Sequence, residues 1–549
     1  MAFGTRLKGL GALVGLVLAA TAAQPPAALD GAGGAALAQQ APGSVLRIRI
    51  GSDVTSFDPH RPSTIENTSF SVHVYDGLFG YNLRTMTIEP RLVREYNVSE
   101  DGLTYTFDLR DGAVWSDGTP VTAGDFVFSL RRILAPETAA QYAFLLYPIL
   151  NAEAANTGAG PVEDIGVRAI DDDTLEFTLA APTPYFLELL THYTAFPVPQ
   201  HVVEAHGESW LRPENIEVNG PYKLVEWIPN TSIHVTKNDL FYDAANVSIA
   251  EVYYYAGEDR SAALRQYRAG EVDLVHDFAS EDWEMMKAEE PEAIHIAPYL
   301  GIYYFAINHN DPALADPRVR RALNLATNRR AITDLVLGTG ELPASSFAPP
   351  LPGYEPARAP WADADPDAAL AEAVRLMEEA GFSAQNPLQL VIRYNTSANH
   401  QRVSVALAAM WEPIHIRASL FNTDVAVHYE DLEQNDFQVG RAGWIADYPD
   451  AQNFLTLLET AAGDFNYGRW SNAEYDALMR EAALTTDLKA RAEILQQAEQ
   501  IALDADANIP IYYYVSKNIV GPQVVGFVPN AKDIHRTRWM SIDESLRRR

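Results

Sequence analysis

Cysteine is absent from this chain of 549 residues. Without thiols the chain forms no disulfide, no thiolate metal site, no iron–sulfur cluster and no lipid anchor on an N-terminal cysteine. Basic residues are also scarce, with 41 Lys and Arg against 73 Asp and Glu and a formal charge of -32. Because nucleic acids and anionic membrane surfaces repel an acidic protein, we expect neither as a partner.

Long apolar runs are missing after the N-terminal region. The uncharged run Leu10–Ala20 follows two basic residues, which is the layout of a secretory signal peptide, and it is too short to span a bilayer. Cleavage can follow Ala22 or Ala38; we prefer Ala38, because the preceding Ala/Gly/Pro stretch could not pack. We therefore predict a signal peptide over 1–38 and a soluble, non-lipidated protein in a bacterial periplasm.

Catalytic motifs are missing as well. The chain has no Gly-x-Ser-x-Gly elbow, no P-loop and no His-Glu-x-x-His. The 13 histidines are scattered, and neither His400 nor His428 has further ligands at metal-binding spacing. Asp447 with Asp450 could act as a glycosidase acid and base, but such pairs arise by chance among 73 carboxylates. We expect no catalytic residue, metal or cofactor.

Strand and helix patterns alternate along the chain. The segments 45–51, 103–109 and 174–179 alternate apolar and polar residues, which is typical of half-buried strands, and the Tyr-rich run 509–515 is typical of a buried strand. Helix starts are predicted at capping residues: Thr122 before 125–134, Asp316 before Pro317, and Ser471 with Glu474 before Tyr475. This alternation indicates an α/β architecture. The Pro-rich stretch 343–360 is predicted to be a surface excursion.

Three segments carry a specific resemblance. They are 115–129 (WSDGTPVTAGDFVFS), 316–324 (DPRVRRALN) and 441–448 (RAGWIADY). The first resembles the signature block of the family 5 solute-binding proteins of bacterial ABC importers, the peptide and nickel group. The second is similar to a helix of that family, and the third to the ligand-binding loop of its periplasmic oligopeptide-binding members.

The resemblance implies a class II periplasmic binding fold with two hinged lobes plus an inserted third lobe. Hinge closure around a ligand is an established motion of such proteins. The implied crossings between lobes lie near Tyr299 and Val515. The implied boundaries are 45–75, 202–300 and 515–549 for the discontinuous lobe I, 76–201 for the inserted lobe II, and 301–514 for lobe III.

The resemblance also implies a site for an extended peptide, which pairs with strands through its main chain. The matching main-chain segments are Ser63, Thr64 and Ile65, and Gly443, Trp444 and Ile445. Asp447 matches the carboxylate that pairs with the ligand α-ammonium, since a closed cleft removes that charge from water. Taken alone, Asp447 is also typical of a loop cap.

Further family positions surround this segment. His400 and Arg441 match positions that meet the ligand C-terminal carboxylate, for which a planar guanidinium is suited. Trp444 would line a side-chain pocket, and Tyr142 and Tyr514 match cleft tyrosines. By residue type alone, Arg441 could equally form a structural ion pair, and the aromatic residues could belong to a core.

Three positions depart from the family pattern, so the identity of the ligand stays open. Val425 and Leu432 stand where the enterobacterial-type oligopeptide binder has a Trp and an Arg, and Leu337 lies near a family lysine. We predict a monomeric receptor, not an enzyme, that binds oligopeptides and delivers them to the permease and ATPase of an ABC importer. The alternatives are a family member for a nickel chelate, opine, heme or glycan fragment, and a secreted hydrolase, which the missing motifs disfavour.

Overall fold

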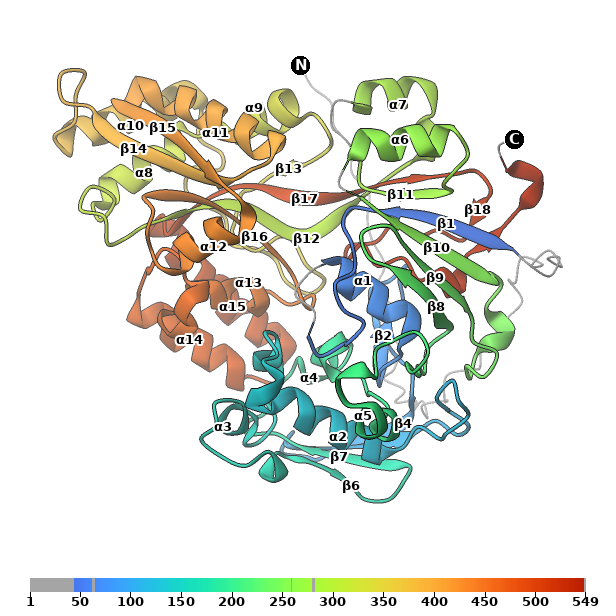
Figure 1. The fold of residues 1–549 in the computed structure, drawn as a ribbon. Coiled ribbons are helices and arrows are strands. Elements are labelled where there is room, and N and C mark those ends of the chain that lie inside the picture. Colours follow the sequence, from blue (N-terminus) through green and yellow to red (C-terminus); the bar gives the residue numbers. More distant parts are fainter. Residues whose placement is uncertain (1–43, 62–64, 258, 279–281, 548–549) are drawn as a thin grey trace, which may run out of the picture. The chain divides into compact units, whose positions relative to one another are not determined.

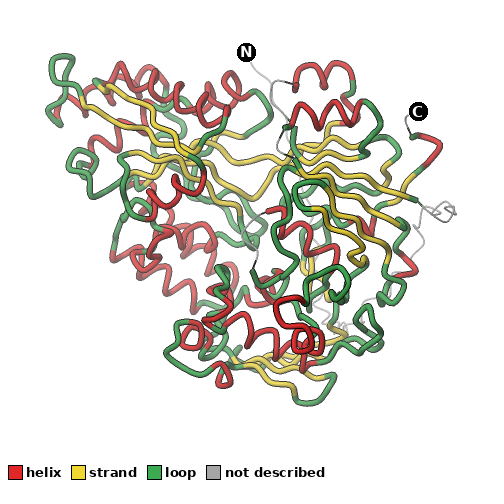
Figure 2. Tube along the Cα trace, viewed as in Figure 1, coloured by secondary structure: helices red, strands yellow, loops and turns green. Residues whose placement is uncertain are grey.

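A mixed β-sheet organises the chain, whose computed structural model describes residues 44–61, 65–257, 259–278 and 282–547. The predicted signal peptide lies outside these residues. Figure 2 shows the strands as a yellow band that continues across the sheet. The strand order is β15 (Ile416–Thr423), β14 (Leu388–Asn395), β16 (Val439–Ile445), β12 (Ile294–Ile307), β17 (Asn508–Val520), β11 (Leu274–His276), β1 (Val45–Ile50), β10 (Glu251–Ala256), β9 (Ser232–Lys237) and β8 (Tyr222–Ile228), with β13 (Leu342–Pro343) pairing with β17.

The strands β12 and β17 connect the two halves of this sheet. They have 14 and 13 residues and pair antiparallel through its middle. Their register shifts between Pro298, which has no N–H for the ladder, and Ile302. This irregularity includes Tyr299 and begins at the pair of Pro298 with Val515, the positions at which the resemblance implies the hinge crossings.

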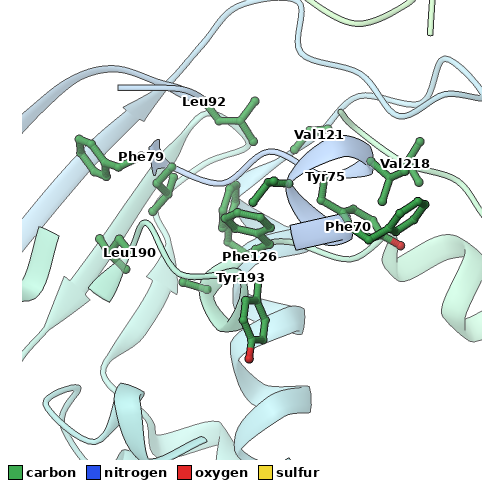
Figure 3. Packing of buried hydrophobic residues seen from close by; sticks show 14 of the residues in the cluster. Phe70, Tyr75, Phe79, Leu92, Val121, Phe126, Leu190, Tyr193 and Val218 are labelled. Carbon is green, nitrogen blue, oxygen red and sulfur yellow. The ribbon is translucent and has the colours of Figure 1, made fainter. Parts of the chain in front are cut away.

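A separate antiparallel sheet has the strand order β4 (Val93–Val98), β5 (Thr104–Leu109), β7 (Thr174–Thr178), β6 (Val167–Ala169). The predicted strands therefore form as β1, β5 and β7, and 509–515 lies in the first part of β17. Figure 3 shows buried side chains of an apolar core that contains residues of both sheets, such as Phe107 of β5 and Ile48 of β1. Phe79, Leu92, Phe126 and Leu190 are each at most 2% exposed, which places them within one continuous apolar core.

Helices flank both parts of the large sheet. In Figure 1, α6 lies beside β11 with α7 next to it, and α11 lies beside β14 and β15. The helices are α1 (Ile65–Val74), α2 (Ala123–Leu134), α3 (Ala152–Asn156), α4 (Phe186–Leu189), α5 (Gln200–His206), α6 (Arg260–Arg268), α7 (Trp283–Glu289), α8 (Pro317–Ala326), α9 (Arg329–Ala331), α10 (Pro366–Glu379), α11 (Ala398–Trp411), α12 (Val425–Glu433), α13 (Gln452–Leu455), α14 (Ala473–Leu484) and α15 (Leu488–Asp504). Among the residues that the structure describes, no helix is both long and apolar enough to cross a membrane.

Two of the predicted helix starts are confirmed and one is wrong. Thr122 caps α2 in a complete capping box, and Asp316 caps α8. The cap of α14 is Asn472 and not Ser471. The Asn472 side chain accepts hydrogen bonds from the backbone N–H groups of Glu474 and Tyr475. The Ser471 hydroxyl instead accepts a hydrogen bond from Thr460 at 2.9 Å.

The Pro-rich stretch 343–360 is not the predicted surface excursion. Phe347 and Tyr354 are 1% and 7% exposed and belong to an apolar core. The buried Glu499 carboxylate holds the stretch, because it accepts the Phe347 N–H at 2.9 Å and the Tyr354 hydroxyl at 2.7 Å. The prolines therefore shape a packed segment, which composition alone did not reveal.

Candidate functional site

The outer edge of β16 is unpaired over most of its length. β16 pairs with β12 from Val439 to Ile445, but its other edge meets β14 only at Val439 and Gly440. The remaining residues of that edge lack a neighbouring strand among the described residues. Such an edge can accept a further strand by main-chain hydrogen bonding.

The direction of the backbone groups along this edge follows from one hydrogen bond. The Ala446 N–H donates to a carbonyl of β12 at 2.8 Å. Because backbone groups alternate in direction along a strand, those of Arg441, Gly443 and Ile445 point away from β12. The Arg441 carbonyl accepts from His428 Nε2 at 2.8 Å, whereas the groups of Gly443 and Ile445 have no partner among the described residues.

A cavity of about 520 Å³ lies along this edge. Its walls come from α1, β11, β16, β17 and the start of α11. Five of the residues predicted from the sequence line it: His400, Arg441, Gly443, Ile445 and Tyr514. The structure therefore gathers, from three distant elements, the residues that the resemblance associates with the ligand main chain and its C-terminal carboxylate.

Arg441 is a buried cation whose partners are all neutral. It is 8% exposed, and its Nη1 donates to the Tyr429 hydroxyl at 3.0 Å and Asn395 Oδ1 at 3.2 Å. Its Nη2 donates to the Tyr514 hydroxyl at 2.7 Å, and the guanidinium lies 4.8 Å from the Tyr303 ring centroid. No carboxylate of the described residues pairs with Arg441, so the structural ion pair considered from residue type is absent there.

The other basic side chains of the cavity are paired. Arg260 contacts Asp277 at 2.7 Å, and Lys517 contacts Glu341 at 2.7 Å. A buried charge without an opposite charge is costly. Arg441 therefore supplies the positive charge that an anionic group in this cavity would meet.

His400 lies close to Arg441 but does not add a second charge. Its Nδ1 lies 3.3 Å from the Tyr303 hydroxyl. Burial, and then the nearby Arg441 charge, lower the pKa of His400 to about 2. The imidazole is therefore neutral and can offer a hydrogen bond only.

Asp447 follows the end of β16 and lies outside the cavity lining. Its backbone N–H donates to Asn453 Oδ1 at 3.1 Å, and Asn453 Nδ2 donates to its Oδ2 at 3.1 Å. No described residue donates to its other oxygen, Oδ1. Burial raises the pKa of Asp447 to about 6, against the lowering effects of Asn453 and of the nearby Lys532. One carboxylate oxygen is thus free for a donor.

Aromatic side chains surround Asp447. The Trp444 indole donates to Asn453 Oδ1 at 2.8 Å, and its ring packs edge-on against Phe465 at 5.8 Å. Tyr142 is close enough for the Asp447 charge to add to the effect of burial in raising its pKa. The structure therefore places Trp444 and Tyr142 at the Asp447 end of the segment and not in the cavity.

The remaining predicted positions are less informative. Ser63 and Thr64 lie outside the described residues, and Ile65 is known only as the first residue of α1. Leu432 is buried against Gly440, and Val425 is 56% exposed at the start of α12. No three His, Asp or Glu side chains converge as metal ligands in the described part of the chain.

Several contacting residues were missed in the sequence. Asn453, Tyr429 and Lys517 touch the site, and Lys532 donates a hydrogen bond to the Asp447 carbonyl. Asn453 lies in α13, shortly after the 441–448 motif. Its closeness in sequence could have suggested that its side chain holds the Asp447 backbone. No local pattern connects Lys532 with Asp447, which is 85 residues away.

Comparison with known proteins places the chain in a family. Residues 87–466 match the bacterial extracellular solute-binding proteins, family 5 Middle. The periplasmic oligopeptide-binding protein OppA of Salmonella typhimurium is 35% identical over 519 residues, covering 93% of this chain and 94% of that protein. The periplasmic murein peptide-binding protein MppA of Escherichia coli is 34% identical over 498 residues, covering 90% and 92%.

A solved structure agrees with the fold. OppA of Haemophilus influenzae in complex with RPPGFSPFR has a TM-score of 0.81 and 32% identity, covering 92% of this chain and 100% of that one. This likeness confirms the predicted α/β class II periplasmic binding fold. The chain belongs to the family 5 bacterial extracellular solute-binding proteins.

Proposed function

We propose that this protein is the periplasmic substrate-binding receptor of an ABC importer and that its ligand is an extended oligopeptide. One observation carries the proposal. In the described part of the chain, an unpaired strand edge runs between a buried cation without an acid partner, Arg441, and a carboxylate with a free oxygen, Asp447. A zwitterionic peptide has the matching charges at its two ends.

The edge of β16 accounts for broad recognition. Main-chain hydrogen bonds to Gly443 and Ile445 hold a peptide backbone without reading its side chains. Asp447 receives the α-ammonium, and Arg441, with His400 as a neutral hydrogen-bonding partner, receives the carboxylate. Tyr514 acts through Arg441 by fixing its guanidinium. The oligopeptide- and murein peptide-binding relatives support this class of ligand.

The remaining parts of the proposal concern assembly. The lobes are those implied by the sequence, with 301–514 closing against 45–75, 202–300 and 515–549 about the irregular β12–β17 pairing. Ligand binding shifts the protein toward its closed state, which the permease and ATPase complex recognises. The protein acts in the periplasm as a non-lipidated monomer, after removal of its signal peptide, and has no catalytic role.

Calorimetry with tri- to hexapeptides tests the proposal. If none of these peptides binds, the proposal is wrong.

The variant Asp447→Asn keeps the shape of the side chain but removes its charge. We expect it to weaken binding of a free-amine peptide by about 2–5 kcal/mol, because a buried ammonium loses its partner. The N-acetylated peptide should be nearly unaffected, and an equal loss for both peptides would refute the role of Asp447.

A further inference from the structure

Three charged side chains from distant segments, those of Asp447, Lys532 and Glu188, form one cluster. Lys532, from the segment before the C-terminus, donates from Nζ to the Asp447 backbone carbonyl and lies 5.2 Å from the Tyr81 ring centroid. The Tyr81 hydroxyl in turn donates to Glu188 Oε2 of α4 at 2.6 Å. The cluster thus contains two acids, Asp447 and Glu188, and one base.

The backbone holds Lys532 beside Asp447. The Leu300 carbonyl of β12 accepts the Ala446 N–H at 2.8 Å, and the Leu300 N–H donates to the Ala531 carbonyl at 2.8 Å. Asp447 and Lys532 are the next residues after these two partners. One residue of the central strand therefore fixes both charged residues, so their contact is built into the fold and does not depend on a ligand.

The charge count leaves room for one more cation. With both acids ionised and Lys532 protonated, Asp447, Glu188 and Lys532 carry a net charge of −1. Burial dominates for each group: it raises the pKa of Asp447 to about 6, raises that of Glu188, and lowers that of Lys532 to about 8. The attraction between Lys532 and the two acids opposes these effects.

Other titratable groups face the cluster from each packed element. Tyr142 and Tyr448 interact with Asp447, and His192 interacts with Lys532. Burial keeps the pKa of His192 well below its usual value, so it adds no charge. Asp450, which acts on Glu188, is paired with Arg491. Lys532 is therefore the cation that acts on Asp447 among the described residues, and it shares its charge with Glu188.

We propose that Lys532 is a positioning residue that keeps the Asp447 carboxylate ionised in the empty cleft, and so makes the site selective for a ligand with a single primary ammonium. This inference rests on the proposed function. Without Lys532, Asp447 would take up a proton from solvent, and an arriving ammonium would first have to displace that proton. Glu188 prevents Lys532 from fully neutralising Asp447, so attraction for the ligand cation remains.

The variant Lys532→Met tests the inference, because it keeps an unbranched side chain of similar length and removes the charge. Affinities for trialanine and N-acetyl-trialanine are measured by calorimetry from pH 5 to 9, in buffers of different ionisation enthalpy that report the protons released. In the wild type, trialanine affinity should fall as pH drops through about 6. In Lys532→Met that midpoint should rise by about one to three pH units, since a neighbouring opposite charge lowers a carboxyl pKa by that amount.

Controls separate this role from a structural one. At pH 7.5 trialanine binding should release more protons in Lys532→Met than in the wild type, whereas Lys532→Arg and the exposed Lys489→Met should match the wild type. Glu188→Gln should move the midpoint the opposite way, to lower pH. Unchanged midpoints in both Lys532→Met and Glu188→Gln, or an equal loss for free and acetylated trialanine, would overturn the inference.

A measurement without peptide distinguishes this inference from the proposed function. The Asp447 carboxyl is titrated by carbon-13 NMR in the unliganded wild type and in Lys532→Met. A higher titration midpoint in the variant, with no peptide bound by the wild type, would support the role of Lys532 and contradict peptide binding. Identical midpoints would overturn the role of Lys532 even if peptides bind.

Discussion

The two ends of the β16 edge present charge in different ways. At the Arg441 end, a guanidinium that is always protonated is held by three neutral oxygens and has no acid partner among the residues that the structure describes. At the Asp447 end, a carboxylate with a pKa of about 6 accepts a hydrogen bond from Asn453, and the Lys532 ammonium donates to the backbone carbonyl of the same residue. The first end is a fixed charge, and the second depends on pH and on its neighbours.

This difference has a consequence for recognition. In the proposed site, Arg441 would pair with the carboxylate of a peptide at any physiological pH. Asp447 would pair with the ammonium only while its carboxyl group is ionised. The proposed site therefore combines a charge that does not depend on pH, Arg441 in β16, with one that does, Asp447 just beyond the end of that strand.

Removing the fixed charge should have the largest effect. We expect Arg441→Met to weaken binding of a free-carboxylate peptide by about 2–5 kcal/mol, because the buried carboxylate loses its partner. Calorimetry with the same peptide as its C-terminal amide provides the control, and the amide should lose far less. Arg441→Lys keeps the charge but not the planar guanidinium, so its affinity for the free-carboxylate peptide should lie between those of the wild type and Arg441→Met. Equal losses for the acid and the amide would place Arg441 outside the site.

Crowding the fixed end should have a smaller effect. In Gly443→Ala the new Cβ would lie 2.7 Å from the Tyr514 hydroxyl and 3.2 Å from Arg441 Nη2. Displacing this hydroxyl loosens the guanidinium, so peptide affinity should fall by about 1–3 kcal/mol, as in other overpacked sites. The matched control is Gly124→Ala, whose Cβ would lie 3.2 Å from the Thr122 hydroxyl, far from β16. Equal affinities for Gly443→Ala and the wild type would show that the edge tolerates a side chain.

Lowering the pH should affect only the Asp447 end, and by the smallest amount. Below the Asp447 pKa of about 6 the carboxyl is protonated, so the affinity for a free-amine peptide should fall about tenfold per pH unit. This pH dependence of the affinity should vanish in Asp447→Asn and for N-acetylated peptides. Amidation of the peptide C-terminus should leave it unchanged. A wild-type affinity that stays constant from pH 7 to pH 5 would mean that Asp447 does not meet the ammonium.

Local sequence rules predicted much of the fold. The capping residues Thr122 and Asp316 and the alternating segments form the expected elements, because these signals act over a few residues. Ser471 failed as a cap because its neighbour Asn472 is an equally good capping residue, and only the tertiary contact with Thr460 decides between them. The burial of the Pro-rich stretch depends on Glu499, more than a hundred residues further along.

At the site too, local sequence rules predict residues within one segment but not contacts between distant segments. The 441–448 motif predicted the residues of one strand edge, and the structure places Arg441, Gly443 and Ile445 along it. It could not predict that Arg441 lacks an acid partner, since that depends on every neighbour brought by the fold. Lys532 and Glu188 stayed hidden for the same reason, because their contacts cross between distant segments.

Site-resolved amide hydrogen exchange with and without tetraalanine tests the central claim most directly. If a peptide adds to the edge of β16, the amides of Gly443 and Ile445 should exchange much more slowly when it binds. The Trp444 amide, which faces β12, should already be protected without peptide and provides the internal control. Binding of tetraalanine that leaves Gly443 and Ile445 as fast as in the free protein would contradict main-chain pairing at this edge.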